Sequence, residues 1–156
     1  MSKRLIASIF CILSCFTLCF SQINTNRVML MGRNALYYED YVLAIQRFNS
    51  VIASKPYLAE PYFYRGLAKF YLEDYAGAAA DCSLALDRRP YSAQYYTLRG
   101  LCRVNMEMYA PAVEDYRASL QQNPMERNNW HNMVLCLMEL DKFDEADSAL
   151  DSMMTL

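Results

Sequence analysis

The sequence predicts an all-α protein, namely an α-solenoid of about four stacked helix-turn-helix repeats. Marker residues recur with a period of 34: proline at positions 56, 90 and 124, and glycine at positions 32, 66 and 100. Alanine at positions 44, 78, 112 and 146 keeps this spacing, as does an aromatic residue at 41, 75, 109 and 143. A period of roughly 20 to 50 residues is typical of solenoids, whose units bury their apolar faces against one another.

The recurring residues also predict where the helices lie. Small residues at two positions of each unit allow two helix backbones to approach closely, and bulky residues fill the space around that crossing. Proline ends the second helix of a unit because it lacks an N–H group and restricts the residue before it. We therefore expect helices near residues 27–38, 41–54, 59–71, 75–88, 93–106, 109–122, 127–139 and 143–155.

This pattern resembles the tetratricopeptide repeat (TPR), a helix-turn-helix unit of about 34 residues. With proline at position 32 of the unit, the units span residues 25–58, 59–92, 93–126 and 127–156, and the last one is incomplete. The stretch GRNALYYEDYVLAIQRF is similar to the start of longer exported TPR proteins of Bacteroides-like bacteria. The resemblance therefore implies that this chain is the N-terminal part of a longer protein of that kind.

Residues 1–21 are predicted to be a secretory signal peptide. Lys3 and Arg4 precede an uncharged apolar run, and Cys19 and Ser21 provide small residues before a cleavage site at Gln22. An uncleaved membrane anchor is the alternative, although a spanning helix needs about 20 apolar residues. A lipoprotein signal is a weaker alternative. We expect a short linker at 22–26, a TPR domain at 27–156, and export to the periplasm or cell envelope of a Gram-negative bacterium.

Charge and motifs argue against several classes of function. Removal of the signal peptide leaves 13 basic and 17 acidic residues, a net charge of −4, which disfavours nucleic acid as a partner. The chain has no Gly-rich phosphate loop, G-x-S-x-G or Cys-x-x-Cys motif. We expect no enzyme, cofactor, metal or small-molecule substrate. Cys82, Cys102 and Cys136 are expected to be small packing residues.

The TPR resemblance implies a concave groove, lined by the first helix of each unit, that binds a protein or peptide segment. The predicted partner-binding residues are Met29, Arg33, Tyr37, Glu60, Phe63, Leu67, Phe70, Tyr71, Thr97, Leu101, Val104 and His131. This surface is mainly apolar and favours an apolar or amphipathic segment. The alternative for Leu67 and Leu101 is packing against the neighbouring first helix. The carboxylate clamp of the family is absent, because Tyr64 occupies the place of its asparagine.

Two charged positions vary together within the chain. Position 7 of the unit is arginine only in the second and third units, and position 23 is aspartate only there. We predict structural ion pairs between the two helices of a unit, Arg65 with Asp81 and Arg99 with Asp115. A second cation follows at position 11, as Lys69 and Arg103. The alternative is a binding site for a charged ligand.

The fourth unit departs from the pattern. Val134 replaces the small residue at position 8, so its helices are expected to cross at a wider spacing, and its apolar end would be uncovered. The leading functional hypothesis is an exported scaffold that mediates protein–protein interaction, with envelope membrane proteins among its expected partners. The alternatives are the docking region of a longer envelope enzyme or chaperone system and a lumenal co-chaperone of eukaryotes, which a missing retention signal disfavours. The sequence leaves the oligomeric state open.

Overall fold

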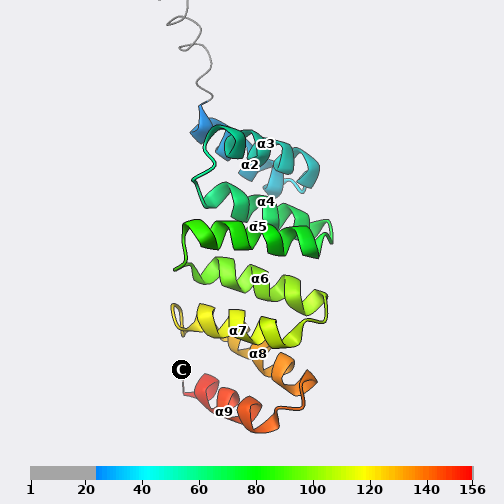
Figure 1. Ribbon diagram of the computed structural model, residues 1–156, viewed down its shortest axis with the longest axis vertical. Coiled ribbons are helices and arrows are strands. Elements are labelled where there is room, and N and C mark those ends of the chain that lie inside the picture. The colour runs from blue at the N-terminus through cyan, green and yellow to red at the C-terminus, as the bar shows by residue number, and fades with distance from the viewer. Residues whose placement is uncertain (1–23, 156) are drawn as a thin grey trace, which may run out of the picture.

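The computed structural model describes residues 24–155, and these residues form eight α-helices and no strand (Figure 1). The helices stack in one column along the long axis of the molecule, with the first unit at one end and α9 at the other (Figure 1). Their bounds are α2 Thr25–Tyr37, α3 Tyr41–Ser54, α4 Glu60–Tyr71, α5 Tyr75–Arg88, α6 Ala93–Asn105, α7 Tyr109–Leu120, α8 Arg127–Glu139 and α9 Phe143–Met154. The predicted all-α solenoid is confirmed.

The turn inside each unit has the same conformation. Its central residue has a positive φ of 56° to 62° in all four units, at Glu39, Glu73, Glu107 and Asp141. The following N–H donates to a carbonyl five residues earlier, as from Asp40 to Ala35 at 2.9 Å. This left-handed arrangement satisfies the free carbonyls at a helix end. In the first two units an aspartate side chain then caps the second helix.

Glycine at position 8 is required by close packing. A Cβ atom on Gly32 would lie 2.6 Å from Cε1 of Phe48, and one on Gly100 would lie 3.0 Å from Cε1 of Tyr116. In the fourth unit Val134 is itself buried at position 8. Leu150, which corresponds to Phe48 and Tyr116, is 37% exposed there, whereas both aromatic residues are fully buried.

Polar contacts at the recurring proline join the first unit to the second and the third unit to the fourth. The hydroxyl of Tyr62 donates to the carbonyl of Pro56 at 3.1 Å, and the indole N–H of Trp130 donates to the carbonyl of Pro124 at 2.8 Å. The guanidinium of Arg88 also donates to the Pro56 carbonyl and lies over the Tyr62 ring at 4.1 Å. In the second and fourth units, the aromatic residue at position 4 therefore binds the proline carbonyl that ends the preceding unit.

The three cysteines in the described part of the chain are free and buried, as predicted for packing residues. Burial raises the pKa of Cys102 to about 12 and that of Cys136 to about 11, so both thiols stay protonated near neutral pH. No helix between residues 24 and 155 has the length and apolar character that crossing a membrane requires. The predicted signal peptide and the start of the predicted linker lie outside the described residues.

Candidate binding groove

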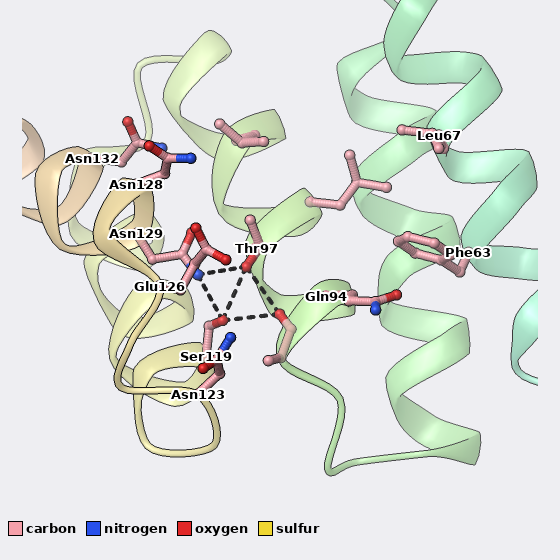
Figure 2. Close-up of a pocket in the computed structure, with 13 residues that line it drawn as sticks. Phe63, Leu67, Gln94, Thr97, Ser119, Asn123, Glu126, Asn128, Asn129 and Asn132 are labelled. Atoms are coloured by element: carbon pink, nitrogen blue, oxygen red, sulfur yellow. Dashed lines mark hydrogen bonds between the residues drawn. The ribbon is translucent and has the colours of Figure 1, made fainter. Parts of the chain in front are cut away.

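Helices α4, α6 and α8 line a hollow of about 580 Å³. Its apolar side is formed by Phe63 and Leu67 from α4 with Leu98 and Leu101 from α6. Its other side carries the side-chain amides of Asn123, Asn128, Asn129 and Asn132, whereas the amide of Gln94 lies toward Phe63 (Figure 2). Figure 2 shows Phe63 and Leu67 on one side, the asparagines on the other, and Thr97 between them. The hollow can therefore hold a chain with one apolar edge and one polar edge.

A buried polar network forms the floor of the amide side. The hydroxyls of Thr97 and Ser119 both donate to the carbonyl of Ala93 at 3.0 Å. The amide nitrogen of Asn129 donates to the same two hydroxyls, at 2.7 and 2.9 Å (Figure 2). Because each hydroxyl donates its single hydrogen to the Ala93 carbonyl, both hydroxyl oxygens act as acceptors for the amide nitrogen of Asn129. The Oδ1 atom of Asn129 is then left without a donor among residues 24–155, although the residue is only 1% exposed.

The electrostatic character of this hollow follows from its lining. Glu126 is its one charged lining residue, and no lysine or arginine of the described residues lines it. An acidic segment would therefore meet no positive charge there. A neutral or basic segment fits this surface better.

A second, smaller hollow of about 300 Å³ lies where α2 approaches α4. It is lined by three predicted partner-binding residues, Met29, Arg33 and Glu60. The guanidinium of Arg33 also lies over the ring of Tyr64, 5.3 Å from its centroid. The predicted residues therefore divide between two hollows, with Phe63, Leu67, Thr97 and Leu101 in the larger one.

The remaining predicted partner-binding residues line neither hollow: Tyr37, Phe70, Tyr71, Val104 and His131. The Tyr71 ring stacks on Tyr41, with 5.1 Å between ring centroids. Phe70 and Val104 are half-buried and pack against the apolar clusters between units. The side chains of Tyr37 and His131 are exposed.

Sequence reasoning missed most of the amide side of the large hollow, although it did place the lining residues Gln94 and Asn128 at groove positions. It considered only the first helices, at groove positions taken from the family resemblance. Ser119 comes from the second helix of the third unit, and Asn123 and Glu126 come from the segment between units. The available signal was the density of asparagine in the stretch NPMERNNWHN, residues 123–132.

The predicted ion pairs form between the two helices of each central unit. Nε of Arg65 donates to Asp81 at 2.9 Å, and Nη2 of Arg99 donates to Asp115 at 2.7 Å. Each aspartate is 2% exposed and receives a second cation, from Lys69 at 2.9 Å and from Arg103 at 2.6 Å. Each carboxylate is therefore surrounded by two cations and withdrawn from water.

The same arginines also connect neighbouring units, which the sequence analysis did not anticipate. Nη1 of Arg65 donates to Asn49 of the first unit at 2.7 Å, and Nη1 of Arg99 donates to Ser83 of the second unit at 3.0 Å. Asn49 and Ser83 both occupy position 25. The arginine at position 7 thus contacts position 23 of its own unit and position 25 of the preceding one.

No protein-family model and no curated protein matches this chain. Its structure is similar to a crystal structure of MamA, with a TM-score of 0.82 and 19% identity, covering 89% of this chain and 81% of that one. It is also similar to the first TPR domain of Spaghetti (RPAP3) bound to the HSP90 peptide SRMEEVD, with a TM-score of 0.72, 22% identity and coverages of 75% and 95%. The Arabidopsis OM64 TPR domain is similar with a TM-score of 0.72 and 20% identity, over 74% of this chain and 95% of that one. Likeness at these identities shows the fold alone, so the chain has the α-solenoid fold of TPR domains.

Proposed function

We propose that this chain is a scaffold that binds an extended protein or peptide segment in the hollow between α4, α6 and α8. The observation that carries the proposal is the lining of the hollow, which sets the apolar side chains of Phe63, Leu67 and Leu101 opposite a row of asparagine side chains. A bound segment would satisfy the exposed amides with its backbone and bury an apolar side chain against the leucines. The proposed activity is binding and not catalysis.

The two sides of the hollow define the chemistry of the segment. An apolar side chain would pack against Phe63, Leu67 and Leu101, and backbone amides would face the asparagines. The segment is neutral or basic, because Glu126 is the charge that it would meet. The RPAP3 domain, which shares this fold, is bound to a peptide in its solved structure. That precedent supports a segment as the ligand, although the HSP90 peptide is acidic and the clamp residues differ here.

A matched pair of leucine variants tests the site. Leu101 and Leu135 both occupy position 9 of their units, but Leu135 does not line the hollow. Capture from an envelope extract should retain a partner on the wild type and on Leu135→Glu, and lose it on Leu101→Glu. A photo-crosslinker at Gln94, followed by mass spectrometry, should mark the same segment. Equal capture by both variants, with unchanged circular dichroism, would place the partner elsewhere.

The proposal includes export to the periplasm or cell envelope of a Gram-negative bacterium as a TPR-family protein. It is supported by the signal-peptide pattern of residues 1–21 and by the Bacteroides-like resemblance of the first unit. Association with envelope membrane proteins would follow from that location. Fusing residues 1–21 to alkaline phosphatase, which folds only after export, should give an active enzyme. An inactive fusion protein that contains the unaltered residues 1–21, including Lys3 and Arg4, would contradict export.

A second candidate function is the docking region of a larger envelope enzyme or chaperone system. It is favoured by the exposed apolar residues on α9, which resemble a surface for a further structural unit. In this case Met154→Glu, at the exposed end of α9, would separate two activities, because partner capture by the hollow would persist while assembly with the working domain would fail. The scaffold proposal alone predicts no such second assembly.

A further inference from the structure

The outer face of α9 repeats a surface that is covered in every earlier unit. Leu86 and Leu120, at position 28 of their units, are 6% exposed because the next first helix packs against them. Met154 occupies the same position in α9 and is 74% exposed. Figure 1 shows α9 at the end of the column, with no described helix beyond it. Three internal copies of this interface thus show what kind of element covers such a face.

A polar contact specifies the covering helix more closely. At the first two junctions, position 25 of one unit accepts a hydrogen bond from the arginine at position 7 of the next, as Asn49 does from Arg65 and Ser83 from Arg99. The third junction lacks this contact, because Arg117 occupies position 25 there and Met133 occupies position 7. Asp151 occupies position 25 in α9. Its side chain is exposed and forms no ion pair within residues 24–155. A carboxylate at this position would accept an arginine more strongly than an amide or hydroxyl does.

A second carboxylate makes a purely apolar cover unfavourable. Asp147 stands at position 21, where the earlier units have Ile45, Ala79 and Val113. It lies four residues before Asp151 and therefore on the same side of α9. An apolar helix or a lipid surface would bury this charge without a partner. The cover must therefore combine apolar residues with positive charge.

We propose that the outer face of α9 binds a further helix-turn-helix unit of this repeat class, whose first helix carries arginine at position 7. The arginine donates to Asp151, and the apolar residues of that helix cover Leu150 and Met154. A second copy of this chain is a poorer occupant. Its α2 has Met31 at position 7 and Asn34 at position 10, where the other units have alanine or cysteine.

The test uses the full chain extended by one appended unit. One version appends a copy of residues 55–92, in which residues 55–58 supply positions 31–34 after Leu156. The copied unit carries arginine at position 7, lysine at 11 and aspartate at 23. The other replaces these three residues by methionine, leucine and alanine, the set that the fourth unit itself contains. Asp151→Ala is then made in both versions and in the unextended chain. The melting temperatures form a cycle that isolates the contact between Asp151 and the appended arginine.

We expect Asp151→Ala to lower the melting temperature of the arginine version by about 3 °C more than that of the methionine version. It should change the unextended chain by less than about 1 °C, because an exposed unpaired charge contributes little to stability. Equal effects in the two extended versions would overturn the proposal. So would a dimer of the unextended chain in sedimentation that Met154→Glu disrupts, because the occupant would then be a second copy. Neither result would affect capture by the hollow.

Discussion

Replacing Asp81 by asparagine tests whether the central charged sets hold the fold together. The variant keeps the shape of the side chain and removes its charge. Asp81 is 2% exposed, and its carboxylate accepts from Arg65 and Lys69. Both cations would remain in place without the anion that they surround. We expect a large loss of stability with no change in the helical content of the folded state.

The size of the loss follows from the burial of the three groups. Removing one partner of a buried ion pair costs about 3–5 kcal/mol, because it leaves an uncompensated charge. Arg65 is 17% and Lys69 is 23% exposed, so the stranded cations can partly reach water. We therefore expect the lower limit, about 3 kcal/mol. For a chain of this length the melting temperature should fall by about 10 °C.

The assay is thermal and urea unfolding followed by circular dichroism at 222 nm. Asp87→Asn is the matched control, because Asp87 is exposed on the same helix and forms no ion pair in the described structure. A rescue variant combines Arg65→Met, Lys69→Leu and Asp81→Ala, which is the set of the fourth unit. An apolar set of suitable volume often replaces a buried ion pair at little cost, so we expect stability within about 1 kcal/mol of the wild type. An unchanged melting point for Asp81→Asn would refute a structural role and favour a charged ligand site.

Three further predictions concern other parts of the molecule. Gly32→Ala should lower the free energy of unfolding by about 1 kcal/mol, because overpacking against Phe48 outweighs the better helix propensity of alanine; a more stable variant in urea titration would contradict this. Hydrogen bonds from Lys142 and Arg117 lower the pKa of Glu145. Its carboxylate therefore stabilises the folded state above the unfolded pKa, and this contribution is lost as the pH falls through the folded pKa. Glu145→Gln should therefore slightly lower the melting temperature at pH 7, and the difference from wild type should close in acid. Cys102, whose pKa burial raises to about 12, should react with a thiol reagent at pH 8 on the order of 1,000-fold faster in urea than in buffer, because unfolding returns the thiol to its ordinary pKa and raises the thiolate fraction by that factor.

The period of 34 residues was sufficient to predict the fold and the helix positions. Each helix ends where a proline or a turn must interrupt it, so the observed bounds lie close to the predicted ones. The left-handed residue in each turn was not predicted. Glu39 and its counterparts are acidic, and non-glycine residues adopt this conformation only when the surrounding hydrogen bonds impose it. Those hydrogen bonds join residues whose proximity the sequence pattern does not reveal.

The candidate site was predictable only where it follows the repeat. Leu67 and Leu101 occupy the equivalent position 9 on successive first helices, and Phe63 lies one turn before Leu67 on α4. Period and resemblance together identify such positions. The floor of the hollow combines Thr97, Ser119 and Asn129 from α6, α7 and α8. Contacts among three helices depend on how the units are rotated against one another, and a single sequence does not specify that rotation. The burial of the Asn129 amide was therefore beyond prediction.

The fourth unit departs from the repeat on both of the surfaces that we propose bind partners. At position 3 the second and third units bury Pro61 and Tyr95, whereas the fourth buries Asn129. A buried amide whose oxygen has no donor among residues 24–155 is less stable than an apolar residue at the same place, so packing alone does not account for it. On the outer face of α9, Asp147 stands at position 21, where the earlier units have apolar residues. A repeat that violates its own pattern at the cost of stability is expected to do so at a functional surface, because places where local rules fail tend to be functional.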